Sequence, residues 1–366
     1  MLQQALVILA GGGIGDALMA IPVARVLRDG GREVTMLANP STKRLLAGHP
    51  LLKEVIVDDQ GGTHAGLSGF LRLVSEIRDR HFGEVLVLWS TVRTAWLSYL
   101  ARIPVRAGQA GRLLYSHLYT HPVSVRSEKG DTRSHWVDCL LDYPRALGIP
   151  VHATSPFLEI TDEDRERSHR LFAEIGIPID RPRVVIHAGK GISLAGKIWP
   201  TGMFARVADE LARRWEVAVV LSGSEPEKPL VELILSECKE TVYDLSGRTS
   251  LRDLAGILSG SLMMICPDSG PMHIAAAVGT PVVAIFALAK DFPDRWHPHG
   301  VPFEVVRKEP PPCPPGCIKE KCKDFRCMAA ITSEMVLEAA ERLRARLPEG
   351  HRDVENNAKG KKWTSA

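Results

Sequence analysis

Residues 268–273 combine side chains that could bind a phosphorylated ligand. Asp268, Ser269 and Gly270 form a turn directly after an apolar run, and His273 lies one turn into the helix that is predicted to follow. In an open parallel sheet, ligands bind at the carboxyl ends of the strands, where a helix begins with unpaired N–H groups that attract phosphate. The alternative is structural: Asp268 or Ser269 would cap the helix, and His273 would be a buried core histidine.

Two further turns in the second half of the chain carry groups that suit the same ligand. Gly189 follows an apolar run and leads through a glycine-containing loop to Lys197, whose ammonium group would attract an anion. Glu227 follows the turn at Gly223, and its carboxylate could bind the hydroxyls of a ribose or could cap the next helix. We expect the Gly189 loop to face the same crevice as Asp268.

The glycine turn near the N-terminus presents a carboxylate. An apolar run at 5–10 leads into Gly11-Gly12-Gly13-Ile14-Gly15-Asp16, which fails the dinucleotide-binding fingerprint in both registers because its sixth position is Asp16 or Leu18. A carboxylate here would repel a pyrophosphate, so the turn is suited to bring Asp16 to another ligand. We expect the start of the following helix to favour the ionised form of Asp16, and the structural alternative is a helix cap.

A basic segment in the first half of the chain could bind an anionic acceptor. Residues 93–133 contain seven Lys or Arg residues, and Glu128 and Asp131 are their only acids. Arg102 and Arg106 are the candidates for acceptor contacts. The alternative is a solvated surface without a ligand.

These turns need two parallel sheets to hold them, and the chain predicts both. Strand-like runs alternate with helical segments in each half, which indicates two doubly wound α/β domains. The predicted strands are 5–10, 33–37, 55–58 and 85–89 in the first half, and 183–187, 216–221, 241–245, 262–266, 282–286 and 303–306 in the second. We expect domains at 1–155 and 156–332, a final helix at 333–347 and a disordered polar tail at 348–366.

Composition limits the class of protein. The 366 residues are 45% hydrophobic and 24% charged with a net charge of +3, as in soluble globular proteins, and no run approaches the roughly 18 apolar residues of a spanning helix. The N-terminal apolar run is too short for a signal peptide, so we expect a cytoplasmic protein. Seven cysteines argue against a disulfide framework. The spacing of Cys313, Cys317, Cys322 and Cys327 leaves open reduced thiols or a structural metal, zinc rather than iron–sulfur.

The motifs, taken in order, resemble glycosyltransferase family 9, which includes the ADP-heptose:lipopolysaccharide heptosyltransferases. They are Gly15-Asp16, the Gly189 turn with Lys197-x-Trp199-Pro200, the Gly223 turn with Glu227, Leu245-Ser246-Gly247-Arg248-Thr249, and Asp268-Ser269-Gly270-x-x-His273. The resemblance implies a GT-B fold, in which two Rossmann-like domains face a central cleft and the final helix crosses back to the N-terminal domain. It also implies a nucleotide-sugar donor in the second domain, an acceptor in the first, and neither cofactor nor metal.

The resemblance also assigns roles to single residues. It makes Asp16 the general base, Lys197 a diphosphate contact, Glu227 a ribose contact, and residues 268–270 with His273 the donor loop. The implied reaction is inverting transfer of a sugar, heptose from ADP-heptose, to a hydroxyl of a lipid-linked saccharide at the inner membrane face. His187-Ala188-Gly189-Lys190 departs from the family pattern. The alternatives are a sugar-nucleotide epimerase or hydrolase of related fold and a non-catalytic nucleotide-sugar-binding protein.

Overall fold

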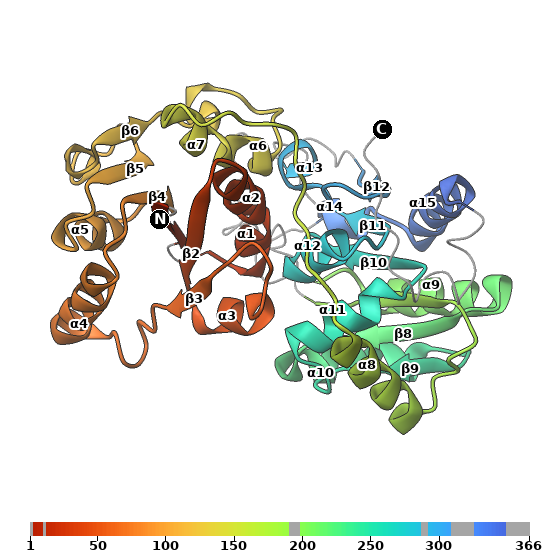
Figure 1. The fold of residues 1–366 in the computed structure, drawn as a ribbon. Helices are drawn as coiled ribbons and strands as arrows, with labels where there is room; N and C mark the ends of the chain where they lie inside the picture. Colours follow the sequence, from red (N-terminus) through yellow and green to blue (C-terminus); the bar gives the residue numbers. More distant parts are fainter. Residues whose placement is uncertain (1–2, 10–11, 190–197, 287–291, 309–325, 349–366) are drawn as a thin grey trace. The chain divides into compact units, whose positions relative to one another are not determined.

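The protein consists of two α/β units, seen here in a computed structural model that describes residues 3–9, 12–189, 198–286, 292–308 and 326–348 (Figure 1). The division falls between Glu159 and Ile160. Lys197, three of the clustered cysteines and the tail from residue 349 lie outside the described residues. Every helix in the described part of the chain is too short or too polar to cross a membrane.

The first unit contains a six-stranded parallel sheet in the order β3-β2-β1-β4-β5-β6. Its strands are β1 Gln3–Leu9, β2 Arg32–Ala38, β3 Glu54–Val57, β4 Glu84–Trp89, β5 Val105–Gln109 and β6 His121–Val123. The central strands are fully buried apolar runs, as expected for a parallel sheet that helices cover on both faces. The expected strands at 5–10, 33–37, 55–58 and 85–89 are confirmed within two residues, whereas β5 and β6 were not expected.

Helices cover both faces of this first sheet. They are α1 Ile14–Met19, α2 Ile21–Asp29, α3 Pro40–Leu46, α4 Gly66–Asp79, α5 Val92–Leu100, α6 Trp136–Leu140 and α7 Asp142–Ala146. The predicted helix after Asp16 is divided at Ala20, and Pro22 lies in the first turn of α2, where its missing N–H costs nothing. The proline therefore lies where a second helix begins. Leu73, Val74 and Ile77 of α4 and Ala95 and Leu97 of α5 pack onto β1 and β4.

The second unit repeats the architecture with a parallel sheet in the order β12-β11-β10-β7-β8-β9. Its strands are β7 Arg183–His187, β8 Ala218–Ser222, β9 Val242–Asp244, β10 Met263–Pro267, β11 Val282–Ile285 and β12 Phe303–Val306. All six were expected, and the bounds of β7 and β12 agree to the residue. The two doubly wound sheets confirm the expected α/β fold class.

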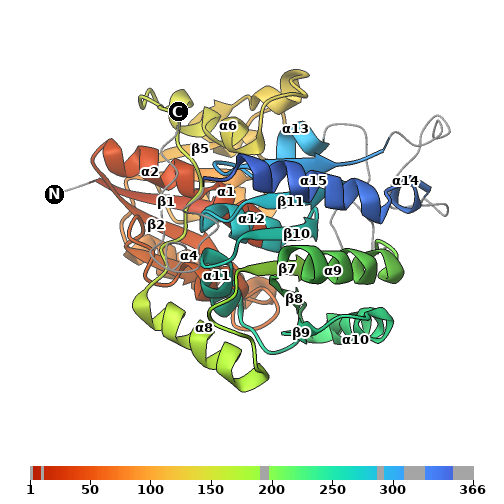
Figure 2. The same cartoon turned by 90° about the vertical axis from the view of Figure 1, so that its right-hand side faces the viewer.

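The helices of the second unit also form two layers. They are α8 Asp162–Ile175, α9 Thr201–Trp215, α10 Lys228–Glu237, α11 Leu251–Ser259, α12 Gly270–Ala277, α13 Phe292–Trp296, α14 Arg326–Ala329 and α15 Ser333–Arg346. α9 contacts α10 and α15, and α11 contacts α8 and α12 (Figure 2). α15 packs on α9, β11 and β12, so it contributes to the core of the second unit. Its expected crossing to the first unit stays a prediction.

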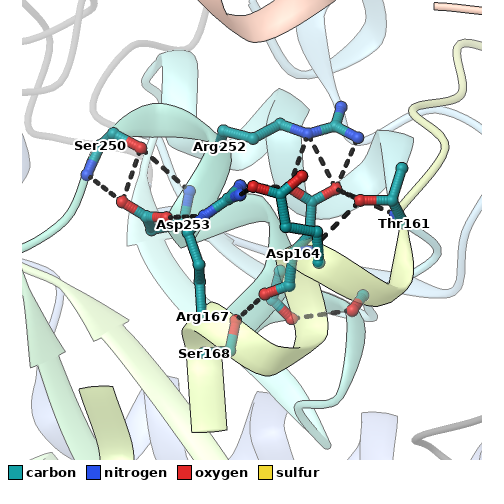
Figure 3. A network of polar contacts seen from close by, with 10 residues as sticks. Thr161, Asp164, Arg167, Ser168, Ser250, Arg252 and Asp253 are labelled. Carbon is teal, nitrogen blue, oxygen red and sulfur yellow. Dashed lines mark hydrogen bonds and ion pairs between the residues drawn. The ribbon is translucent and has the colours of Figure 1, made fainter. Parts of the chain in front are cut away.

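A buried ion-pair network joins α8 to α11 (Figure 3). Asp164, whose side chain is 2% exposed, accepts hydrogen bonds from Arg252 Nη2 at 2.6 Å and from Thr161 Oγ1 at 2.9 Å, and it also pairs with Arg167. Arg167 Nε in turn donates to Asp253 at 2.9 Å. Burial alone would raise the pKa of Asp164, but the hydrogen bonds from Arg252 and Thr161 prevail and lower it. The network fixes α11, the helix that precedes β10.

Candidate active site

The strand order of each unit reverses direction at one point, and the candidate site residues follow the strands at these points. In the first unit the chain runs outward from β1 to β3 and then returns to β4, so the reversal lies between β1 and β4. In the second unit it lies between β7 and β10. Crevices at the carboxyl ends of such strand pairs are the usual ligand sites of doubly wound sheets. We call the side of a sheet where its strands end the carboxyl edge.

Asp16 lies at the carboxyl edge of the first unit, in the first turn of α1. Its Oδ2 accepts a hydrogen bond from the Gly13 N–H at 2.8 Å. A Cβ at Gly12 would lie 2.9 Å from the Asp16 Cβ, so the turn needs glycine there to approach this side chain. The expected cap is therefore present, and it fixes the carboxylate without removing it from the edge, because the side chain remains partly exposed.

The pKa of Asp16 is shifted upward, whereas a downward shift was expected. Burial is the largest effect and raises the pKa above the ordinary value of 3.8, whereas the hydrogen bond from Gly13 lowers it and is the smaller effect. The N–H at the helix start does favour the ionised form, as expected, but partial desolvation outweighs it and the net shift of the pKa is upward. A carboxylate with a raised pKa is a stronger base than an exposed aspartate, which suits proton acceptance.

Asn39 holds the Asp16 turn from the neighbouring strand, and sequence reasoning missed it. It lies directly after β2, its Nδ2 donates to the Gly12 carbonyl at 3.0 Å, and its Oδ1 accepts from the Thr42 N–H at 2.9 Å. The same side chain therefore caps α3 and ties the glycine turn to the next strand. An Asn-Pro pair after an apolar run indicates a helix start, but nothing in it indicates the contact with Gly12.

In the second unit, the start of α12 contains a buried hydroxyl without a partner. Ser269 is 4% exposed, and its Oγ makes no hydrogen bond within the described part of the chain. It precedes the eight-residue helix α12, and its side chain does not cap that helix. Leaving a hydroxyl buried and unsatisfied costs about 1–3 kcal/mol. Together with the N–H groups of the helix start, this hydroxyl is a ready donor for a phosphate oxygen.

His273 faces the interior one turn into α12. Burial is the main cause that lowers its pKa to about 4, and the charges of His297 and His299 contribute to the same shift, so the imidazole is neutral at physiological pH. The residue can donate or accept one hydrogen bond but carries no charge toward a diphosphate. Asp268 is also buried, and its backbone N–H donates to the Ile285 carbonyl at 3.2 Å.

The carboxyl edge of β7 brings three residues together: His187, Gly189 and Glu227. A Cβ at Gly189 would lie 2.3 Å from His187 Nε2 and 2.4 Å from Glu227 Oε1, so only glycine fits between them. Glu227 Oε2 accepts from the Ser224 N–H at 2.7 Å and from the Ser224 hydroxyl at 2.6 Å, which confirms the capping alternative for this oxygen. The other carboxylate oxygen is directed at the Gly189 turn.

His187 is the second residue that sequence reasoning missed. Its Nδ1 lies 3.3 Å from the Ser222 hydroxyl on the adjacent strand β8. Burial lowers its pKa, and the negative charge of Glu227 opposes this effect. A neutral histidine thus lies below the Gly189 turn and beside the carboxylate. A histidine that ends an apolar run before a glycine turn was the only local signal for it. Trp199 of the same motif is fully buried, and its indole N–H donates to the Ile331 carbonyl at 2.9 Å, so it packs in the core of the second unit.

Arg102 and Arg106 lie elsewhere in the first unit. Arg106 occupies the start of β5, and Arg102 follows α5, so both lie at the edge of the sheet opposite Asp16. Arg106 Nε donates to the Leu118 carbonyl at 2.8 Å and Nη1 to the Ile103 carbonyl at 2.5 Å, which is a structural role. The structure therefore does not bring these two residues to Asp16. Their acceptor contact stays a prediction.

The clustered cysteines contribute only one described residue. Cys327 is buried at the start of α14, and the other three lie outside the described ranges. Within those ranges, no group of three or more His, Cys, Asp or Glu side chains is arranged to hold a metal ion. The nature of the cluster stays a prediction.

Comparison with known proteins bears on this site. The model of glycosyltransferase family 9 (heptosyltransferase) matches residues 70–323. Lipopolysaccharide heptosyltransferase 3 of Escherichia coli K12 is 24% identical over 94% of this chain and 98% of its own length.

Two solved structures share the fold. A family 9 glycosyltransferase from Veillonella parvula has a TM-score of 0.83 at 23% identity, covering 94% of this chain and 98% of that one. Escherichia coli heptosyltransferase WaaC with ADP has a TM-score of 0.69 at 14% identity, covering 93% of this chain and all of that one. The two sheets thus form a GT-B fold, and the expected enzyme class is confirmed. The family model covers more than half of the chain, and this chain therefore belongs to glycosyltransferase family 9.

Proposed function

We propose that this protein transfers heptose from ADP-heptose to a hydroxyl of a lipopolysaccharide core or a related lipid-linked saccharide. The observation that carries the donor half of this proposal is the buried, unpartnered hydroxyl of Ser269 at the start of α12. It lies at the strand reversal of the second unit, where a diphosphate would accept its hydrogen bond. Family membership and relatives named lipopolysaccharide heptosyltransferases support the sugar. A family neighbour was solved with ADP, which supports the nucleotide.

The donor would contact three turns of the second unit. Ser269 Oγ and the first N–H groups of α12 would bind the diphosphate, and His273, neutral at physiological pH, would add one hydrogen bond. Glu227 would accept hydrogen bonds from ribose hydroxyls through the oxygen that faces Gly189. Lys197 is proposed as a further diphosphate contact on the strength of the motif alone. The alternatives of an epimerase, a hydrolase or a silent binding protein have no observation that favours them.

Asp16 would act as the general base of a direct displacement. The acceptor hydroxyl oxygen forms a bond to the anomeric carbon while the bond from that carbon to the diphosphate oxygen breaks. The hydroxyl proton moves to the Asp16 carboxylate, and the nucleoside diphosphate leaves with the electron pair of the broken bond. The raised pKa of Asp16 favours this proton transfer, and the hydrogen bond from Gly13 keeps the carboxylate oriented.

A lipid-linked acceptor places the reaction at a membrane surface, so we include peripheral membrane contact in the proposal. Catalysis there needs the acceptor saccharide to reach the carboxyl edge of the first unit, where Asp16 lies. The proposal commits to no further acceptor contact.

Replacing Ser269 by alanine tests the donor site. An ordinary buried serine would lose stability on this change, whereas an unsatisfied hydroxyl should leave the unfolding free energy unchanged or raised. Affinity for ADP-heptose should fall about 2- to 10-fold, which corresponds to the roughly 0.5–1.5 kcal/mol of one neutral hydrogen bond.

The matched control is Ser261→Ala. Ser261 is equally buried, but its hydroxyl donates to the Ile257 carbonyl at 2.8 Å, so this variant should lose stability and keep donor affinity. Thermal shifts across a panel of nucleotide-sugars supply the affinities, since a donor at 100 times its dissociation constant stabilises by about 2.7 kcal/mol. A larger shift with another nucleotide-sugar than with ADP-heptose would overturn the proposed donor. Unchanged donor affinity in Ser269→Ala would remove the residue from the site.

A further inference from the structure

Exposed large apolar side chains are concentrated in one region of the first unit. The described part of the chain exposes ten of them, and only Ile179 and Leu233 lie outside residues 67–114. Six define what we call the apolar patch: Trp89, Val92, Trp96, Tyr99, Leu113 and Leu114. Scattered exposed leucines are normal on a protein surface, but a concentration of this kind marks an interaction site.

The patch is built on α5 and the chain that precedes Tyr115. Val92, Trp96 and Tyr99 are spaced four and three residues apart, so they share one face of α5, and the rings of Trp96 and Tyr99 meet edge to face at 5.8 Å. Leu113, 99% exposed, and Leu114, 74% exposed, precede Tyr115, whose hydroxyl donates to the Ser90 carbonyl at 2.9 Å. That bond holds the leucines beside the segment that joins Trp89 to α5.

The chain that carries the patch contains arginines and no acids. Residues 85–127 contain five arginines and no Asp or Glu. The Arg106 guanidinium lies 5.6 Å from the centre of the Tyr99 ring, and Arg102 is exposed directly after α5. Three of the five arginines form ion pairs with acids from other segments: Arg93 with Asp58, Arg112 with Glu128 and Arg126 with Asp142. Arg102 is therefore the exposed cation on which the charge argument depends. Figure 1 shows α5 near β5 and β6, which form one end of the first sheet.

This combination of side chains fits an anionic lipid surface. Trp and Tyr prefer the boundary between headgroups and acyl chains, leucines at loop tips enter the acyl region, and arginines bind lipid phosphates while their stems stay in apolar surroundings. An apolar protein partner would not need an exposed arginine, Arg102, at the end of the patch. Each cation near an anionic membrane surface adds to the attraction.

One end of the patch, at Trp89, adjoins the edge at which Asp16 lies, and Arg102 marks the other end. Trp89 is the last residue of β4 and pairs in register with Leu9, the last residue of β1, and the Asp16 turn follows β1. A surface bound to lipid through the patch would therefore bring the carboxyl edge of the first unit close to saccharides carried by that lipid.

We infer that the apolar patch, with Arg102 at its end, is a docking surface for a bilayer that contains anionic phospholipids. This inference deepens the proposed function, on which it rests for the lipid-linked acceptor. It reassigns Arg102 from the acceptor saccharide to lipid headgroups.

Flotation with phospholipid vesicles tests the inference without donor or acceptor, so its failure is distinguishable from a failure of the transferase proposal. The full chain is mixed with vesicles of phosphatidylcholine alone or with vesicles that also contain about one third phosphatidylglycerol, whose negative surface potential attracts cations. The wild type should bind the anionic vesicles, and less at high salt because the Debye length shortens. Leu113→Ser with Leu114→Ser should lower the partition coefficient at least about 10-fold, since both side chains leave the acyl boundary.

Matched variants distinguish the effect of changing the patch from the effect of changing any exposed residue. Leu233→Ser, on α10 of the second unit and 52% exposed, should bind like the wild type. Arg102→Glu should weaken binding to anionic vesicles only, whereas Arg181→Glu, an exposed arginine of the second unit, should not. The inference is overturned by absence of vesicle binding, by equal losses in the patch and Leu233 variants, or by equal binding to neutral and anionic vesicles. Loss of self-association in the leucine variants without loss of vesicle binding would assign the patch to a second copy instead.

Discussion

Replacing Gly189 by alanine tests how the end of β7 positions Glu227. The added Cβ would lie 2.3 Å from His187 Nε2 and 2.4 Å from Glu227 Oε1. Ordinary contact distances between heavy atoms are about 3.5 Å or more, so each approach is about 1 Å too short. At least one of the two side chains must move.

Neither side chain can move without loss. Glu227 is held by the Ser224 N–H at 2.7 Å and by the Ser224 hydroxyl at 2.6 Å, and His187 is buried with its Nδ1 3.3 Å from Ser222 Oγ. Overpacking of this kind costs about 1–3 kcal/mol, so we expect Gly189→Ala to lower the unfolding free energy by about 2 kcal/mol. If Glu227 binds the ribose, its displacement also removes a charge-assisted hydrogen bond, and donor affinity should fall about 10- to 100-fold.

Chemical unfolding and calorimetry with ADP-heptose measure the two effects. Gly61→Ala is the control, because a Cβ there meets no atom within 4 Å and the backbone conformation is open to any residue. Gly189→Ala combined with Glu227→Ala should recover part of the lost stability and none of the affinity. Unchanged donor affinity in Gly189→Ala would refute the ribose contact, and unchanged stability would refute the steric argument.

Two further variants test residues that hold elements of the site in place, Asp164 and Asn39. Asp164→Asn should cost about 3 kcal/mol, because it leaves Arg252 without its buried partner. Since the pKa of Asp164 is lowered, its contribution is present above pH 3.8 and is lost as the pH falls through the folded-state pKa, so unfolding curves of parent and variant should converge in acid. Asn39→Ala removes the hydrogen bond to the Gly12 carbonyl, and kcat should fall about 10- to 100-fold at unchanged donor KM. A parallel change in both constants would assign Asn39 to donor binding instead.

The strands with apolar sequences were predictable, and those whose burial depends on distant side chains were not. β10 and β11 are continuous apolar runs between turn residues, so their sequence alone indicates buried strands. β5 contains Arg106 and Gly108 and lacks such a run. Its glycine is needed because the Tyr119 ring lies against it, where a Cβ would come within 2.2 Å. A contact across eleven residues of chain leaves no periodic signal.

The site residues also fall into two groups: those that the nearby sequence indicates and those whose contacts depend on the tertiary fold. The Ser269 turn and the Asp16 turn follow from local chemistry, because glycine and a polar residue after an apolar run indicate the end of a strand. The direction of the Asp16 pKa shift could not be predicted, because it depends on burial by the whole fold. The contact between Gly189 and Glu227 likewise requires two neighbouring strands, β7 and β8, to be aligned.

Turnover of the Asp16→Asn variant is the most direct test of Asp16 as the general base. The amide can still accept the Gly13 hydrogen bond but cannot take a proton, so kcat should fall about 10²- to 10⁴-fold with donor affinity unchanged. Stability near neutral pH should be equal or higher, because burial disfavours the ionised carboxylate. In the parent, kcat/KM should rise with pH through the raised pKa of Asp16. Asp253→Asn is the control, because Asp253 caps α11 in the same way, accepting from the Ser250 N–H at 3.0 Å, and should affect stability rather than turnover. Turnover of Asp16→Asn within a few-fold of the parent would contradict the assignment of Asp16 as the general base.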